Sequence, residues 1–197
     1  MTTTPFYEKE LYQYVKKTPI LTNSDLDELA GCQLFFKCEN LQVTGSFKYR
    51  GACNSLLALT KNQDPKGVIT VSSGNHGAAL AKAGKVFGVK THIIVPENSA
   101  KAKIANIKKY GAQISYCSTN PTKRQSALES KQQELGYHLI PAYNYMDVIH
   151  GQSSCAHEIF TEISDLDSLI CPVSGGGLAS GTILARDNMS KNTQIFL

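Results

Sequence analysis

Residues 67–96 read "GVITVSSGNHGAALAKAGKVFGVKTHIIVP", and this stretch decides the fold. The β-branched run at 67–71 predicts a strand, the alanine-rich stretch at 75–87 predicts a helix, and 91–96 predicts a second strand. Gly88 stands just beyond the helix, where a left-handed residue commonly ends one. A strand, helix and strand of these lengths indicate a unit of two parallel strands joined by a crossover helix.

The same alternation extends in both directions along the chain. Further strands are expected at 33–39, 113–117, 137–140 and 168–173, and further helices at 46–59, 99–110, 121–135, 151–163 and 176–189. Thr4 and Pro5 predict the start of a first helix that ends before "TP" at 18–19. The pattern predicts an α/β fold with a mostly parallel sheet covered by helices on both faces.

The last residues, "NTQIFL" at 192–197, read as the opening of another strand. A parallel strand that has just begun needs a crossover to follow it, because parallel neighbours are joined by long connections. We therefore expect this sequence to be the N-terminal part of a longer fold.

Composition excludes several classes of protein. The 197 residues are 42% hydrophobic and 18% charged, as in ordinary globular proteins, and the net charge of +4 is spread along the chain. The lysines of 100–110 alternate with apolar residues at helical spacing, so we expect no nucleic-acid partner. No signal peptide and no run of about 18 apolar residues is present, and the six cysteines are scattered, which favours a reducing, cytoplasmic location without membrane contact.

Two glycine-rich turns each follow an expected strand and lead into an expected helix, at 72–81 ("SSGNHGAALA") and 174–181 ("SGGGLASG"). Free backbone N–H groups at a helix start attract anions. Taken alone, each turn is either such an anion site or only a tight connection. Neither matches the phosphate-loop pattern of ATP-binding proteins, and a dinucleotide fingerprint is at best approximate.

Two other motifs have competing interpretations. In "HEIFT" at 157–161, Thr161 stands where a zinc-binding helix needs its second histidine, so we predict no metal site and place His157 and Glu158 on the surface. In "GSFKYRG" at 45–51, Lys48 opens a helix, where the positive end of the helix dipole disfavours a cation. Lys48 is therefore either a solvated surface lysine or a nucleophile.

The conjunction of "GSFKYRGA" (45–52), "SSGNHGAALA" (72–81) and "SGGGLASG" (174–181), in this order, resembles the signatures of fold-type II pyridoxal-phosphate enzymes, in the branch of threonine and serine dehydratases and serine racemases. "TPI" (18–20), "DVIHGQ" (147–152) and "KIANIKKYGAQI" (103–114) are also similar to that branch. The resemblance implies a three-layer fold like the tryptophan synthase β-subunit, truncated at its C-terminus. It further implies a small domain at 67–144 and part of a large cofactor-binding domain at 1–66 and 145–197.

The resemblance also implies a role for each matching residue. Lys48 would form the Schiff base with pyridoxal 5'-phosphate and act as the catalytic base, with Phe47 along the pyridine ring and Asn75 on the ring hydroxyl. The phosphate would be held by Ser174, Gly175, Gly176, Gly177 and Leu178. The substrate carboxylate would be held by Ser72, Ser73, Gly74, Asn75 and His76. Ser73 would be a second catalytic residue if it delivers a proton on the opposite face.

By this resemblance the leading function is an ammonia-lyase that converts L-threonine or L-serine to a 2-oxo acid and ammonia by β-elimination. Serine racemase is the closest alternative. A non-catalytic remnant of the family is a second alternative, and a nucleotide-binding α/β domain a third. The expected partners are a small amino-acid substrate and, in a full-length protein, further copies of the same chain.

Overall fold

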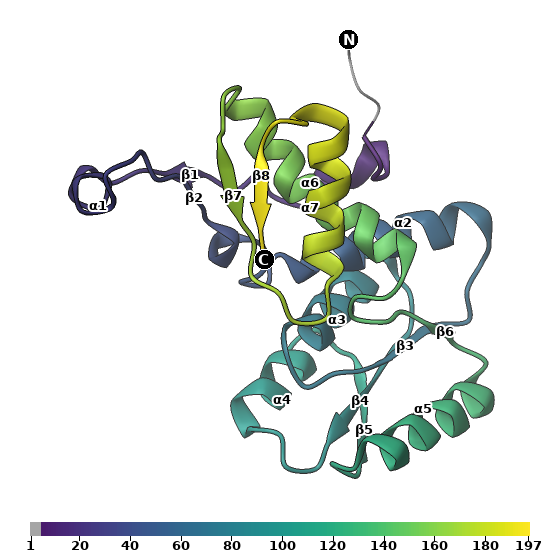
Figure 1. Cartoon of the computed structure of the whole chain (residues 1–197). Helices are drawn as coiled ribbons and strands as arrows, with labels where there is room; N and C mark the ends of the chain where they lie inside the picture. Colours follow the sequence, from purple (N-terminus) through teal and green to yellow (C-terminus); the bar gives the residue numbers. More distant parts are fainter. Residues whose placement is uncertain (1–4) are drawn as a thin grey trace.

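The computed structural model describes residues 5–197, and the lower part of the molecule in Figure 1 is built on a four-stranded parallel sheet. The strands are β3 (Val68–Val71), β4 (Thr91–Pro96), β5 (Gln113–Cys117) and β6 (His138–Leu139), in the spatial order β5-β4-β3-β6. All four were predicted from the sequence, and β4 and β5 have the predicted bounds.

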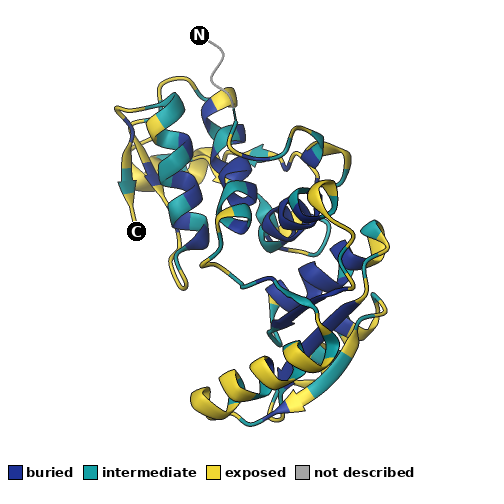
Figure 2. Ribbon diagram, turned by 90° about the vertical axis from the view of Figure 1, so that its right-hand side faces the viewer, coloured by how far each residue is buried: buried dark blue, intermediate teal, exposed yellow. Residues whose placement is uncertain are grey.

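Helices cover both faces of this sheet, as predicted. Helix α3 (Asn75–Phe87) and helix α4 (Lys101–Lys108) contribute to a core with Val68 and Ile93, whereas helix α5 (Pro121–Leu135) packs Leu128 against Ile69 and Ile94. Neighbouring strand residues thus point to opposite faces, as the two-residue period of a strand requires. Figure 2 shows the inner strands β3 and β4 as largely buried, whereas the edge strand β5 is partly exposed and much of the outer face of α5 is exposed. The expected three-layer α/β arrangement is confirmed.

The order of the strands reverses once. From β3 the chain moves outward to β4 and then β5, and the connection through α5 returns to β6 on the other side of β3. The carboxyl ends of β3 and β6 therefore lead into loops that leave the sheet side by side. Ligands of open parallel sheets bind at such a reversal, outside the carboxyl ends of the strands.

A second group of elements lies beside this sheet. It consists of helices α2 (Lys48–Asn62), α6 (Met146–Glu162) and α7 (Gly177–Met189), together with the parallel pair β7 (Ser168–Ile170) and β8 (Gln194–Phe196). Helices α2 and α6 pack closely where Gly51 and Gly151 meet. A Cβ atom added to Gly151 would lie only 2.7 Å from the Cα atom of Gly51. Both positions therefore require glycine.

An arm projects from this group (Figure 1). It contains the antiparallel pair β1 (Ile20–Leu21) and β2 (Phe36–Lys37) and the short helix α1 (Ser24–Ala30), and a 3₁₀ turn, η2 (Glu39–Leu41), follows it. The sequence reading missed β1 and α1. Local signals for α1 were present, since the side chain of Asn23 accepts a hydrogen bond from the Leu26 amide and Gly31 ends the helix at φ 69°.

The predicted first helix is wrong. Its proposed cap, Thr4, lies outside the described residues, and the segment forms only a 3₁₀ turn, η1 (Lys9–Gln13). Side chains from elsewhere bind the backbone amides on both sides of that turn: Glu8 N donates to Asn54 and Lys16 N donates to Gln42. These tertiary hydrogen bonds replace those that a longer helix would have made.

Several other boundaries also differ. The strand expected at 33–39 is reduced to β2, helix α6 begins at Met146 rather than at 151, and β7 ends at Ile170. Pro172 follows that end closely and has no N–H group to continue a ladder. Among residues 5–197, no helix is both long enough and apolar enough to span a bilayer.

Candidate active site

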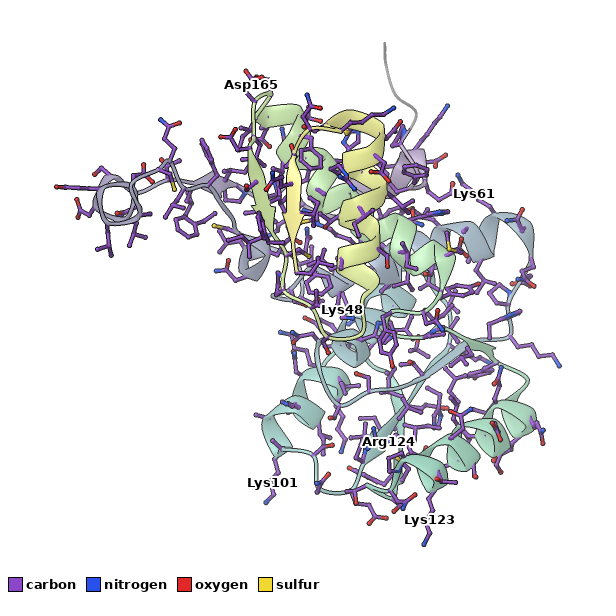
Figure 3. The ribbon with its side chains drawn as sticks, in the orientation of Figure 1. Lys48, Lys61, Lys101, Lys123, Arg124 and Asp165 are labelled. Carbon is purple, nitrogen blue, oxygen red and sulfur yellow. The ribbon has the colours of Figure 1, made fainter. Side chains whose placement is uncertain are left out.

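A cavity of about 410 Å³ lies where β3 and β6 end and α7 begins. It is lined by Phe47, Lys48, Ser72, Asn75, His76, Ala142, Tyr143, Pro172, Val173, Ser174, Gly175, Gly176, Gly177, Leu178 and Ala179. In Figure 3 the labelled Lys48 lies where the loop into α7 meets the part of the chain that carries the four-stranded sheet. The three sequence motifs, far apart in the chain, therefore meet at the reversal of strand order.

Lys48 is the first residue of α2, and its side chain is half-buried. The Nζ atom donates a hydrogen bond to the backbone oxygen of Ala142 at 2.6 Å and lies 5.2 Å from the centre of the Phe47 ring. None of the ion pairs within residues 5–197 involves Lys48. Burial lowers the pKa of the Lys48 amine, which increases the fraction of it that is in the neutral, nucleophilic form.

The loop after β3 is shaped by Ser72. Its Oγ atom accepts hydrogen bonds from the amides of Gly74 and Gly77, both at 3.2 Å. A Cβ atom on Gly77 would lie 2.5 Å from the Ser72 backbone oxygen, so this turn requires glycine there. The amides of Asn75 and His76 remain at the start of α3, where helix geometry provides no partner within the helix. They can receive an anion such as a carboxylate.

His76 is buried beneath this loop and is neutral. Its Nε2 atom lies 2.9 Å from the backbone oxygen of Ile140, so it carries the proton that it donates there. Burial lowers the pKa of His76 to about 4, and the positive charge of Lys48 acts in the same direction, against the hydrogen bond to Ile140. The buried Nδ1 atom has no hydrogen-bond partner among the described residues.

The loop before α7 uses its glycines for two reasons. Gly176 precedes the helix at φ 85°, a left-handed conformation that favours glycine. Gly175 and Gly177 instead lie against Tyr143, where an added side chain would collide with the ring at Gly175 and would be tightly packed at Gly177. Within the described chain no side chain caps this end of α7, so its first amides are available to an anion.

The cavity gathers most of the predicted site residues. Ser73 and Gly74 belong to the loop after β3 but do not line the cavity. Sequence reasoning missed Ala142 and Tyr143, which follow β6. The signal that could have found them is their position after a predicted strand, but the strand order that brings β6 beside β3 is not readable from the pattern of residues.

Glu158, predicted on the surface, is buried with only 2% of its surface exposed, and that prediction was wrong. The guanidinium of Arg50, itself fully buried, donates to Glu158 at 2.5 Å and to Glu39 at 2.7 Å. Lys37 adds an ion pair of 2.6 Å to Glu158. Burial alone would raise the pKa of Glu158, but its hydrogen bonds to Arg50 and Lys37 outweigh that effect and hold it below the usual range.

A second cavity, of about 420 Å³, lies between the arm and helix α6. Its walls are mainly apolar, and its charged residues, Lys37 and Glu39, belong to the cluster around Arg50. Of the predicted site residues it shares only Phe47 and Leu178 with the first cavity. It therefore does not bring the predicted catalytic groups together.

The first cavity thus combines an amine of lowered pKa with two helix N-termini that enter it from different sides. Such a site suits a ligand with two anionic groups and a carbonyl between them, because the helix starts bind the anions and the amine attacks the carbonyl. The Ala142 oxygen accepts from a neutral amine without removing its lone pair.

Comparison with known proteins gives one family. The model of the family described as "Pyridoxal-phosphate dependent enzyme" matches residues 11–197. The chain is 43% identical over 188 residues to serine racemase of Dictyostelium discoideum, covering 95% of this chain and 58% of that protein. It is 41% identical over 184 residues to L-threo-3-hydroxyaspartate ammonia-lyase of Saccharomyces cerevisiae, covering 93% and 56% respectively.

Solved structures agree with these matches. A threonine deaminase from T.th. superposes with a TM-score of 0.89 at 36% identity, over 95% of this chain and 60% of that one. The chain therefore spans somewhat more than half the length of the relatives that it matches.

Proposed function

This chain belongs to the family of pyridoxal-phosphate-dependent enzymes, and from that premise we propose that it carries the Schiff-base lysine and both anion sites of an ammonia-lyase acting on L-threonine or L-serine. The resemblance seen in the sequence is confirmed by the family match. The observation that supports this most directly is Lys48, a half-buried amine of lowered pKa without a carboxylate partner among residues 5–197, in a cavity that two helix N-termini enter. The products would be a 2-oxo acid and ammonia.

The residues present fit the cofactor. The first amides of α7, after Gly176, would hold its phosphate, and Asn75 would bind its ring hydroxyl. Phe47, beside Lys48, would lie along the ring. When bound, pyridoxal phosphate supplies an electron sink that weakens the bonds at the α-carbon of the substrate.

The protein's own groups then do the remaining work. The amides at the start of α3 would orient the substrate by its carboxylate, with Ser72 holding the loop in shape. Lys48, whose pKa burial lowers, would be the residue that holds the cofactor through its aldehyde, and once the substrate amine has freed it, its amine would take up the α-proton. Neutral His76 adds no second positive charge beside that amine.

Serine racemase is the second candidate, and the match to a serine racemase at 43% identity favours it. Racemisation needs a proton donor on the face opposite Lys48, and Ser73 is the residue that we propose for it. Ser73 lies in the loop after β3 without lining the cavity, so a shift of that loop would be part of this activity.

We also propose the domain division implied by the resemblance, with residues 67–144 as a small domain and residues 1–66 and 145–197 as part of a large one. The continuous four-stranded sheet from β3 to β6 supports the first unit. Self-association of the full-length protein and a cytoplasmic location remain part of the proposal. Six free cysteines, four of them buried, are compatible with that location.

The test is covalent capture of the cofactor. The chain is incubated with pyridoxal phosphate, reduced with borohydride and digested, and the labelled peptide is identified by mass spectrometry. We expect the label on Lys48, and a Lys48→Ala variant should lose it while keeping its circular dichroism spectrum. A label spread evenly over surface lysines, or none at saturating cofactor, would contradict the proposal. Keto-acid release and D-serine formation then separate lyase from racemase.

A further inference from the structure

One short segment contacts all three motifs of the cavity. Residues 140–143 follow β6 and precede α6. The backbone oxygen of Ile140 accepts from His76, that of Ala142 accepts from Lys48, and the Tyr143 ring lies against the glycine loop. We define this loop as residues 174–177. The segment therefore fixes the glycine loop relative to the lysine.

The contact between Tyr143 and the glycine loop is close. A Cβ atom added to Gly175 would lie 2.6 Å from the Cε1 atom of the Tyr143 ring and closer still to two other ring carbons. One added to Gly177 would lie 3.0 Å from the Tyr143 Cα atom and 3.1 Å from its Cβ atom. Tyr143 thus excludes a side chain at Gly175 and leaves little room for one at Gly177, whereas Gly176 is favoured by its own φ angle of 85°.

The glycine loop has few side chains of its own that could restrict its conformation. Three successive glycines carry no side chains, and glycine loses more conformational freedom on folding than any other residue. Ser174 and Gly175 are exposed to solvent. The rigid aromatic ring therefore supplies a surface that restricts the loop. The Tyr143 hydroxyl has no hydrogen bond within the described part of the chain, so the ring itself makes the contact.

We propose that Tyr143 is a positioning residue that holds the glycine loop in the shape that receives a phosphate group, at a fixed separation from Lys48. That this phosphate belongs to the cofactor rests on the proposed function. The packing of the Tyr143 ring against the glycine loop is independent of the proposed function, so the packing and the phosphate binding are tested separately.

The packing is tested by a double-mutant cycle on thermal unfolding. Gly175→Ala should lower the midpoint by at least about 4 °C, because overpacking strains the contact. In the Tyr143→Ala background the same change should lower it by less than half as much, because the ring is gone. Gly74→Ala is the control, since a Cβ atom there meets open space. Equal losses from Gly175→Ala in both backgrounds would overturn the proposal.

The role in binding is tested by titration with pyridoxal phosphate and with pyridoxal, which lacks the phosphate. Tyr143→Ala should weaken binding of pyridoxal phosphate about tenfold or more and binding of pyridoxal much less, because preorganisation of the loop is lost. Tyr143→Phe should bind both like the parent. Equal weakening for both compounds, or none for either, would overturn the role. If the parent binds neither, the proposed function fails, and the unfolding cycle still decides whether Tyr143 holds the loop.

Discussion

Lys48 and Arg50 stand two residues apart on α2 and carry the same formal charge, but their surroundings differ completely. Lys48 faces the cavity, where its one hydrogen bond goes to a neutral carbonyl oxygen. Arg50 faces the opposite part of the molecule, where it is fully buried between Glu39 and Glu158. Burial lowers the pKa of Lys48, whereas the two carboxylates raise the pKa of Arg50 despite its burial.

The difference gives two residues of one helix different roles: Lys48 is suited to chemistry and Arg50 to holding the structure together. A half-buried amine without a carboxylate partner has a lowered pKa, which increases the neutral fraction that a nucleophile needs. A buried cation between two carboxylates keeps its proton and ties together the elements that supply them, here α2, η2 and α6. Because Arg50 anchors the start of α2, it also fixes the direction in which that helix presents Lys48 to the cavity.

The largest effect is expected from Arg50→Met. Removing the guanidinium leaves Glu39 without its ion-pair partner and Glu158 with Lys37 alone, and breaking a buried ion pair costs about 3–5 kcal/mol. Urea denaturation at pH 7 measures this loss. The control is Lys61→Ala, which removes ion pairs to Glu8 and Glu10 that are exposed to solvent and should change stability far less. Similar losses from both variants would contradict the burial of the cluster.

The next effect is the acid sensitivity caused by His76. The pKa of His76 is about 4 in the folded protein, against 6.5 for the ordinary group, so the unfolded chain takes up a proton first as the pH falls. Stability present above pH 6.5 is therefore lost between about pH 6.5 and 4, by about 3 kcal/mol. In His76→Gln this loss should disappear. The measurement is the unfolding free energy of parent and variant across that range, and parallel curves would show that His76 is not buried.

Glu158→Gln should cost about 2 kcal/mol at pH 7, because hydrogen bonds between charged groups are lost while Glu39 still pairs with Arg50. The pKa of Glu158 is lowered in the folded protein, so its contribution is present above the ordinary pKa of 4.5 and is lost as the pH falls through the folded value. The variant and the parent should therefore converge in stability in acid. A constant difference down to the lowest pH would contradict the ionised pair.

The two environments were not equally readable from the sequence. The strand–helix alternation, the parallel sheet and the three motifs follow from local patterns, because glycine punctuation and residue periodicity are local properties. The place of Lys48 at a helix start left it either a surface lysine or a nucleophile, and the resemblance of the three motifs to a known family assigned it the second role. The burial of Glu158 depends on helix α6 packing against α2, and a motif that begins like a zinc site gave no hint of an arginine partner far away in the chain.

The same distinction explains the errors in the fold. The expected first helix failed because Asn54 and Gln42, distant in sequence, bind its backbone amides. Tyr143 was missed because the contact between its ring and Gly175 depends on the return of the chain to β6. In each case the deciding interaction is tertiary, and a local pattern contains no record of it.

The smallest effect on stability is expected from Lys48→Met, the same replacement as at Arg50. The pKa of Lys48 is lowered in the folded protein, so its charged form is disfavoured there at pH 7, and methionine relieves that cost. The hydrogen bond to Ala142 is lost, which costs about 1 kcal/mol. The two effects oppose each other, so the unfolding free energy should change by no more than about 1 kcal/mol, whereas capture of pyridoxal phosphate should vanish. A loss as large as that of Arg50→Met would mean that Lys48 is held by a carboxylate and is a structural cation rather than a nucleophile.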